Sequence, residues 1–194
     1  IAGPTGSGKS TTLQRSLNSL LRERRRQINI LTIEDPPEYD IPGAAQIPVN
    51  TTQSETDKTE AFTKAISAAM RSDPDVIMIG EIRTDSSASL AFTAAMTGHQ
   101  VWASLHANDA ISILDRLLDL IVDIFKLTDH TLVTGLIGQR LIIKVCPHCA
   151  LNFAEAKMRG FVSDVMENDL NNIAIYEFIA YIRFTIPECF NHFT

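Results

Sequence analysis

The stretch Gly3-Pro4-Thr5-Gly6-Ser7-Gly8-Lys9-Ser10 decides the fold, because it matches the complete pattern G-x-x-x-x-G-K-[ST]. Bound phosphates need backbone N–H donors at close range, and the glycines at positions 3, 6 and 8 leave room for them. In this pattern Lys9 reaches the β- and γ-phosphates, and the hydroxyl of Ser10 binds Mg²⁺. The stretch therefore predicts a site for a nucleoside triphosphate. Its expected contacts are Thr5, Gly6, Ser7, Gly8, Lys9, Ser10 and Thr11.

A helix is expected directly after this loop, over residues 9–25, with leucines at 13, 17, 20 and 21. Its N-terminal end would present a positive dipole to the phosphates. The alternative is a glycine-rich turn that caps an ordinary helix. A phosphate loop also normally follows a buried strand, and the two residues before Gly3 are too few to make one. We therefore expect a fragment that lacks an N-terminal strand and an N-terminal domain.

Composition and charge argue against several classes of protein. The chain has 194 residues, of which 45% are hydrophobic, enough for one domain with a core and an appendage. Its net charge of −6 supplies no overall positive field, so no nucleic-acid partner is expected. No apolar stretch approaches the roughly 18–20 residues that span a bilayer, which predicts a cytoplasmic protein without a transmembrane segment. Three cysteines are too few for a disulfide framework.

Apolar strand-like runs alternate with helical patterns along the chain. Strands are expected at 28–33, 45–49, 76–79, 101–105 and 139–145, and helices at 9–25, 59–71, 86–96, 110–120 and 132–137. This alternation predicts an α/β fold with a largely parallel sheet. We divide the chain into an ATPase-like core at 1–145 and a cysteine-containing, helical extension at 146–194.

Acids and a histidine stand at the ends of three expected strands. Glu34 and Asp35 follow the first strand, Glu81 the third and His106 the fourth. Because parallel sheets bind ligands at the carboxyl ends of their strands, we expect these side chains in one site with the phosphate loop. Hydrolysis of a γ-phosphate needs a positioned water, a metal and donors for the developing charge. We expect Glu81 to orient the attacking water. Glu34 is expected to act through Mg²⁺-bound water or on the attacking water, and His106 to contact the γ-phosphate.

Each of these residues has a structural alternative. In that alternative, Glu81 is a solvated loop residue and Glu34 is a simple helix or loop cap. His106 is then a structural histidine at a strand end. Asp35 is followed by two prolines and would only shape a turn. The phosphate loop in the same chain favours the functional interpretation.

Four stretches together resemble the secretion ATPases. They are the phosphate loop, the Ile-Glu-Asp-Pro-Pro-Glu-Tyr segment at 33–39, the segment 71–83 that ends in Gly-Glu-Ile-Arg, and the segment 97–108 that contains Leu-His-Ala-Asn. They look like the Walker A, Asp, atypical Walker B and His boxes of that family. Its members are the hexameric motors of type II secretion, of type IV pilus assembly and retraction, and of conjugative pili. The resemblance runs from residue 1 to about residue 149.

The resemblance implies a RecA-like P-loop core that hydrolyses ATP with Mg²⁺ as a ring-shaped homo-hexamer and powers type IV pilus assembly or type II secretion. It implies Lys9 and Ser10 on phosphate and Mg²⁺, and Glu81 as the catalytic glutamate. It adds Arg71 or Arg116 as the arginine that completes a site across a subunit boundary, with a surface salt bridge as the alternative. It also implies peripheral association with the inner membrane through a platform protein of the secretion or pilus system.

The cysteines suggest a second, incomplete feature. Cys146 and Cys149 resemble the first half of a four-cysteine zinc knuckle that many secretion and pilus-assembly members carry. Cys189 has no second partner, so four thiolates cannot be assembled, although His148 or His192 is an alternative ligand. After residue 150 the resemblance fades into an expected helical segment at 153–184.

Two other functions compete with the secretion or pilus motor. One is a nucleic-acid translocase or helicase on the same RecA-like fold, against which the acidic charge argues. The other is a fragment that binds nucleotide without turnover. The cysteine pair favours assembly or secretion over retraction, and a conjugative-pilus motor stays open.

Overall fold

The computed structural model describes residues 1–49, 55–141, 150–151, 153–160 and 184–185. The chain divides into two compact units, Ile1–Leu141 and Ile142–Thr194. Within the described ranges, no helix is both long and apolar enough to cross a membrane.

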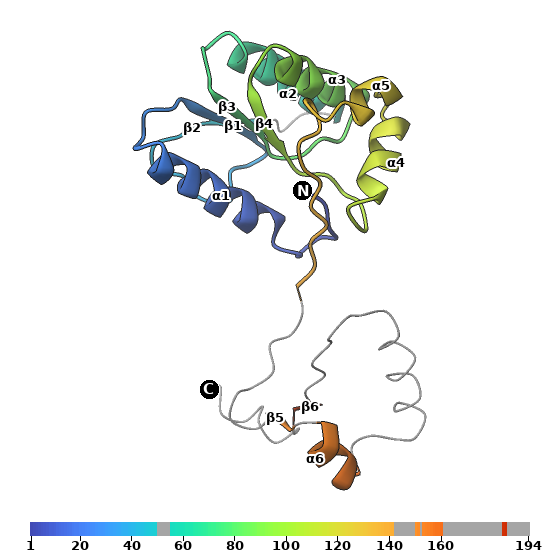
Figure 1. Cartoon of the computed structure of the whole chain (residues 1–194). Helices are drawn as coiled ribbons and strands as arrows, with labels where there is room; N and C mark the ends of the chain where they lie inside the picture. The colour runs from blue at the N-terminus through green and yellow to red at the C-terminus, as the bar shows by residue number, and fades with distance from the viewer. Residues whose placement is uncertain (50–54, 142–149, 152, 161–183, 186–194) are drawn as a thin grey trace. The chain divides into compact units, whose positions relative to one another are not determined.

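A parallel sheet lies at the centre of the first unit (Figure 1). Its strands are β1 (Ile30–Glu34), β2 (Ala45–Pro48), β3 (Val76–Ile79) and β4 (Gln100–Ala103). They are arranged in the order β2-β1-β3-β4, and every neighbouring pair is parallel. All residues of β1 and β3 are buried, as expected for strands covered on both faces. The predicted α/β fold with a parallel sheet is therefore confirmed.

Helices cover both faces of this sheet. They are α1 (Lys9–Glu23), α2 (Glu55–Ala69), α3 (Asp85–Met96), α4 (Ser112–Asp119) and α5 (Ile124–Thr128). Figure 1 shows α1 on one side of the sheet and α2 and α3 on the other. The short α5 was not predicted, and its N-terminus is capped by Asp123, whose carboxylate accepts a hydrogen bond from the amide of Phe125 at 2.8 Å.

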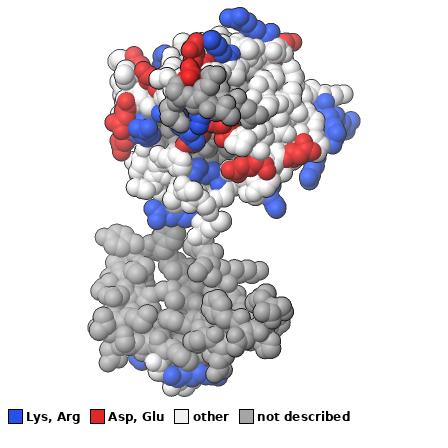
Figure 2. Space-filling model, turned by 180° about the vertical axis from the view of Figure 1, so that it is seen from behind, with Lys and Arg blue, Asp and Glu red and all other residues white. Residues whose placement is uncertain are grey.

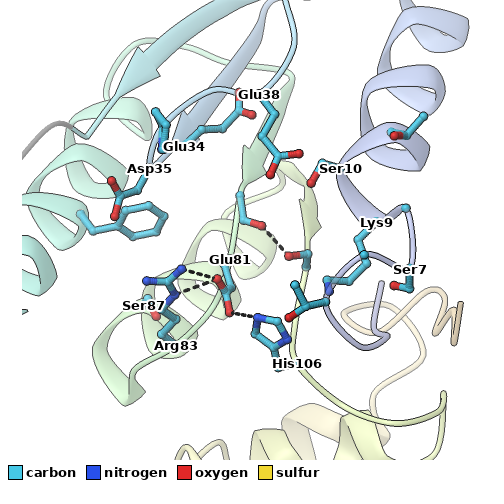
Figure 3. Close-up of a pocket in the computed structure, with 18 of the residues that line it drawn as sticks. Ser7, Lys9, Ser10, Glu34, Asp35, Glu38, Glu81, Arg83, Ser87 and His106 are labelled. Carbon is cyan, nitrogen blue, oxygen red and sulfur yellow. Dashed lines mark hydrogen bonds and ion pairs between the residues drawn. The ribbon is translucent and has the colours of Figure 1, made fainter. Parts of the chain in front are cut away.

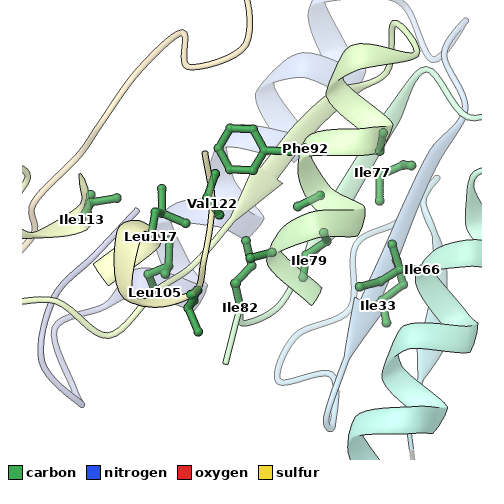
Figure 4. Close-up of a cluster of buried hydrophobic side chains, with 14 of the residues drawn as sticks. Ile33, Ile66, Ile77, Ile79, Ile82, Phe92, Leu105, Ile113, Leu117 and Val122 are labelled. Atoms are coloured by element: carbon green, nitrogen blue, oxygen red, sulfur yellow. The ribbon is translucent and has the colours of Figure 1, made fainter. Parts of the chain in front are cut away.

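Two hydrophobic cores attach these helices to the sheet. The core under α1 contains Leu13, Leu17, Leu21, Ile30, Val76 and Met78. The core on the opposite face joins Ile33, Ile77 and Ile79 to residues of α2, α3 and α4 (Figure 4). Successive residues of β3 thus point to opposite cores, as the period of two in a strand requires. Each fully buried isoleucine contributes about 1.5–3 kcal/mol relative to an exposed one, so the strand ends are held firmly from both sides.

The helix predicted at 132–137 is wrong. Its first residue, Leu132, lies in a turn, and its last, Ile137, accepts a hydrogen bond from the amide of Ala2 at 2.7 Å, next to a parallel bridge between Ala2 and Gly138. Pairing with the start of the chain overrides the local helical pattern. The strand predicted at 139–145 is absent over 139–141, and its remaining residues lie outside those described.

In the second unit, β5 (Ala150–Leu151) pairs antiparallel with β6 (Phe184–Thr185), and α6 spans Phe153–Met158. The helix predicted at 153–184 begins at the expected residue, but it ends at Met158, and Phe184 lies in β6, so the prediction is wrong at these described positions. Its part from 161 to 183 lies outside the described residues, as do Cys146, Cys149 and Cys189, so the zinc hypothesis stays a prediction.

Candidate functional site

A pocket of about 670 Å³ lies where the phosphate loop meets the carboxyl ends of the strands. That volume suits a small organic ligand. All seven residues predicted to hold the nucleotide line it, together with Glu34, Glu81 and His106. Further lining residues that carry polar or charged groups are Asp35, Glu38, Tyr39, Lys58, Thr59, Arg83, Thr84, Ser87 and Ser104. The structure thus brings the predicted strand-end residues and the loop to one place.

The phosphate loop is shaped by glycines with left-handed backbone angles. Gly6 has a φ of 77° and Gly8 a φ of 85°, and α1 begins at the next residue, Lys9. The ammonium group of Lys9 donates hydrogen bonds to the carbonyls of Gly3 at 2.7 Å and Pro4 at 3.2 Å. Lys9 therefore spans its own loop, next to the amides at the N-terminus of α1 that suit an anion.

Glu34 is the last residue of β1, and its side chain is buried. One of its oxygens, Oε1, accepts hydrogen bonds from the hydroxyl of Thr32 at 2.7 Å and from the amide of Gln46 at 3.1 Å. Both of these partners are neutral groups, and they fix the orientation of the carboxylate. The sequence predicted Glu34 after the strand, whereas the structure includes it in the strand.

Glu81 follows β3 after one glycine, and its side chain is only 18% exposed. Its Oε2 accepts from Nε of Arg83 at 2.7 Å and lies 2.6 Å from Nη2 of the same guanidinium. Its Oε1 lies 2.9 Å from Nε2 of His106, as the dashed lines in Figure 3 show. His106, from the segment after β4, thereby joins the ends of two neighbouring strands.

Gly80 lies where the end of β3 comes close to the end of β1. A Cβ at this position would lie 3.1 Å from the carbonyl oxygen of Ile33 and 3.3 Å from the Cα of Glu34. A side chain here would require the end of β1 to shift by a few tenths of an ångström, so glycine suits this close approach of the two strand ends. The sequence contains this signal in the Gly-Glu pair that follows the apolar run, although Gly80 received no role there.

Several site residues were missed from the sequence. Arg83, two residues after Glu81, could have been found from its spacing, since it lies in the stretch that resembles the third family box. Tyr39 also lines the pocket, and its hydroxyl lies 3.1 Å from that of Thr11. Gln46 and its contact with Glu34 had no local sequence signal, because β2 comes beside β1 only in the folded sheet.

The two arginines considered for a subunit boundary lie outside this pocket. Arg71 is exposed in the turn after α2, and Arg116 lies on α4. Neither lines the pocket of the described chain, so their action across a boundary stays a prediction.

The oxygen donors around the loop suit Mg²⁺. The hydroxyl of Ser10 and the carboxylate of Glu34 line the same pocket, and Mg²⁺ typically takes one or two protein oxygens together with phosphate and water. Among the described residues no three His, Cys, Asp or Glu side chains converge to hold a metal by themselves. That donor set fits an ion that arrives with a phosphate ligand.

The chain is similar in sequence to known secretion system proteins. The model of the family described as "Type II/IV secretion system protein" matches residues 1–181. The type II secretion system protein HxcR of Pseudomonas aeruginosa is 48% identical over 149 residues, which are 77% of this chain and 30% of that protein. The type II secretion system protein E of Klebsiella pneumoniae is 45% identical over 150 residues. The chain thus spans less than a third of the length of these two relatives.

Solved structures show the same likeness. The ATPase DotB of Yersinia pseudotuberculosis is 31% identical, with a TM-score of 0.55 over 69% of this chain and 35% of that one. The pilus retraction motor PilT, solved with bound ADP, is 28% identical, with a TM-score of 0.52 over 90% of this chain and 51% of that one.

Proposed function

Because this chain belongs to the type II/IV secretion system protein family, we propose that it binds ATP with Mg²⁺ at its phosphate loop and hydrolyses the γ-phosphate. The sequence resemblance to secretion ATPases is confirmed by this membership, and the RecA-like α/β fold by the solved neighbours. The proposed activity is that of the whole protein, and the described pocket is its proposed catalytic site.

The convergence of Lys9, Glu34, Glu81 and His106 on one pocket supports this proposal most directly. Glu81 is the proposed base, since it is the carboxylate that is both partly shielded from solvent and linked to the histidine. It would position the attacking water and accept its proton, which is worth about 10²–10⁴-fold in rate for a well-placed group. His106 would exchange its contact with Glu81 for a γ-phosphate oxygen.

The phosphate loop would supply binding. On arrival of the nucleotide, the Lys9 ammonium would leave the carbonyls of Gly3 and Pro4 and donate to phosphate oxygens instead. Contacts to a doubly charged phosphate are stronger than those to neutral carbonyls. Ser10 and Glu34, the latter through bound water, would hold Mg²⁺, which neutralises charge on the β- and γ-phosphates when it is bound.

We extend the proposal to the motor as a whole. Its relatives are named type II secretion system proteins, and one structural neighbour is a pilus retraction motor. We place the chain in a ring, as a homo-hexamer in which Arg71 or Arg116 of one subunit approaches the pocket of the next. The ring would act in the cytoplasm on a platform protein of the inner membrane and so drive secretion or pilus assembly.

Charge on the surface argues against the nucleic-acid alternative. Figure 2 shows Lys and Arg interspersed with Asp and Glu over one face of the first unit, without a basic stripe among the described residues of that face. Nucleic-acid binding depends on clustered positive charge. If DNA nevertheless stimulated the ATPase rate in a salt-dependent way, the translocase would replace the secretion motor.

The deciding experiment is phosphate release from MgATP by the chain and its Glu81→Gln variant. The variant is expected to keep nucleotide affinity and to lose about 10²–10⁴-fold in turnover. Glu60→Gln is the matched control, because Glu60 lies on the exposed face of α2 and pairs only with Lys64 among the ion pairs described. If Glu81→Gln hydrolysed ATP at the unaltered rate, the assignment of Glu81 as the base would be refuted. If the unaltered chain bound ATP but released no phosphate, it would be a nucleotide-binding scaffold.

A further inference from the structure

The short segment 137–140 lies directly against the phosphate loop, although more than a hundred residues separate the two in sequence. The amide of Gln139 donates to the carbonyl of Ala2 at 2.8 Å, and the amide of Ala2 donates to the carbonyl of Ile137 at 2.7 Å. These two hydrogen bonds fix the backbone of the segment next to the first residues of the loop.

The side chain of Gln139 then reaches over the loop with both ends of its amide. Its Nε2 donates to the carbonyl oxygen of Ser7 at 2.8 Å. Its Oε1 accepts from the hydroxyl of Thr12, in the first turn of α1, also at 2.8 Å. One planar amide thus connects the middle of the phosphate loop to the helix whose N-terminus faces the nucleotide. A donor and an acceptor on one group are what glutamine supplies.

Gln139 lies close to two glycines of the phosphate loop. A Cβ at Gly8 would lie 2.9 Å from Nε2 of Gln139, and a Cβ at Gly3 would collide with the carbonyl oxygen of Gln139. Gly8 also has a φ of 85°, which already favours glycine. Gly3 therefore leaves room for the backbone of Gln139, whereas at Gly8 the nearby atom is the movable end of the Gln139 side chain.

The opposite side of the segment contacts the loop that follows His106. A Cβ at Gly138 would lie 2.7 Å from the amide nitrogen of Ala110, so the two backbones touch. The guanidinium of Arg140 donates to the carbonyl of Asn108 at 3.4 Å. The segment 137–140 consequently lies between the part of the pocket that would bind phosphate and the loop that carries the histidine.

We infer that Gln139 is a positioning residue, which holds the phosphate loop in its binding conformation through Ser7 and Thr12. It touches no reacting atom, and it acts by lowering the cost of ordering the loop when nucleotide binds. This inference rests on the proposed nucleotide site and assigns a further residue to it. Since Gln139 stabilises the loop before and after the reaction alike, its loss should weaken ADP and ATP binding equally and change turnover at saturation little.

The test compares Gln139→Met, which keeps the length of the side chain, with Gln139→Glu and the unaltered chain. Gln139→Met should raise the Kd for MgADP and the KM for ATP about 25-fold, since a net hydrogen bond contributes roughly fivefold and two are lost. Gln139→Glu keeps the acceptor for Thr12 but turns a second acceptor toward the Ser7 carbonyl. It should therefore weaken MgADP binding at least as much as Gln139→Met does. Gln27→Ala, at an exposed position after α1, is the control that should keep the unaltered Kd.

A double-mutant cycle with Thr12→Val gives a measurement that a general loss of stability would not reproduce. Thr12→Val alone should weaken MgADP binding, and in the Gln139→Met background it should weaken it clearly less, because the shared hydrogen bond is already gone. Thr12→Ser, which keeps the hydroxyl, should restore most of the affinity. If Gln139→Met does not fold, Gln139→Glu and the Thr12 variants carry the test.

The outcomes separate this inference from the proposed function. If Gln139→Met and Gln139→Glu bind MgADP as tightly as the unaltered chain while Lys9→Ala does not, the positioning role of Gln139 is wrong and the nucleotide site stands. Additive effects of the Thr12 and Gln139 substitutions would equally overturn it. If the unaltered chain binds neither MgADP nor MgATP, the proposed function fails and the inference with it.

Discussion

The two sides of the pocket are held in different ways. On the loop side, Gln139 contacts Ser7 and Thr12 through uncharged groups, and the Lys9 ammonium rests on backbone carbonyls. On the acid side, Glu81 is bound between a guanidinium and an imidazole. The loop side is thus held through uncharged partners, whereas Glu81 on the acid side is held by two ionisable side chains.

This difference indicates which step each side serves. A loop fixed by neutral contacts changes little between substrate and transition state, so it contributes to binding at every stage. A carboxylate between Arg83 and His106 can exchange partners as charge develops on the phosphate. We therefore expect substitutions on the loop side to change affinity, and substitutions on the acid side to change turnover.

The largest effect on the loop side is expected from Lys9→Ala. It removes the cation that would contact the β- and γ-phosphates, and the loss of one or two charge-assisted hydrogen bonds should weaken MgATP binding about 100-fold. Titration calorimetry with MgATP measures it, and Lys64→Ala, on an exposed helix position, is the control. If Lys9→Ala bound MgATP as tightly as the unaltered chain, the expectation that loop-side substitutions change affinity would be wrong.

Gly80→Ala should come next, and it acts where β1 and β3 meet. The new Cβ would press on the Ile33 carbonyl and the Glu34 backbone, so we expect the unfolding free energy to fall by about 1–3 kcal/mol. Displacement of Glu34 should lower turnover more than affinity. Urea unfolding and phosphate release measure the two effects.

Gly135→Ala provides the matched control for that substitution. A Cβ at Gly135 would meet nothing within 4 Å, and the residue has no positive φ. The control should therefore be neutral or slightly stabilising, since alanine restricts the unfolded chain. Equal stability and turnover in the two alanine variants would contradict the role given to Gly80.

Most of the parallel sheet could be predicted from sequence, because its central strands β1 and β3 are largely apolar runs bounded by clear breaks. β3 matches its prediction residue for residue. The failure at 132–137 has a physical reason, namely backbone pairing with Ala2, which lies far away in sequence. Local periodicity carries no information on such a partner.

The candidate site was predictable to a similar extent. A motif identifies the phosphate loop in the sequence, and a place at strand ends identifies Glu34, Glu81 and His106. Gln46 and Gln139 do not, because each reaches its partner only through tertiary contacts, across β2 and across the loop respectively. Residues that do chemistry leave a local pattern, whereas residues that support them often leave none.

Thr32→Val tests the neutral support of an acid-side residue. The substitution keeps the shape of the side chain but removes the hydroxyl that donates to Glu34 inside the core. Loss of one hydrogen bond to a buried carboxylate should cost about 1–3 kcal/mol of unfolding free energy. Thermal unfolding with and without MgATP measures it, and a variant as stable as the unaltered chain would show that the amide of Gln46 suffices for Glu34.

The smallest expected effect is a response to acid, which Asp109 introduces in the loop that follows His106. Hydrogen bonds from the backbone amide and the hydroxyl of Ser112, at 2.8 and 2.9 Å, lower the pKa of Asp109 below its ordinary value of 3.8. A carboxyl whose pKa is depressed in the folded state stabilises the fold above its unfolded pKa, and this contribution is lost as pH falls through the folded value.

The loop that carries His106 should therefore loosen below pH 3.8, whereas the contacts of Gln139 with Ser7 and Thr12 contain no titratable group. Asp109→Ala should lower Tm by the same small amount at about pH 7 and about pH 5, and by less near about pH 3, because acid removes the same contribution from the unaltered chain. Hydrogen exchange at the Ser112 amide locates the change, since its protection should fall with pH while that of the loop-side amides does not. A Tm difference between Asp109→Ala and the unaltered chain that stays constant down to about pH 3 would mean that the charge of Asp109 does not distinguish the two sides. Parallel loss of protection on both sides would mean that they unfold as one unit.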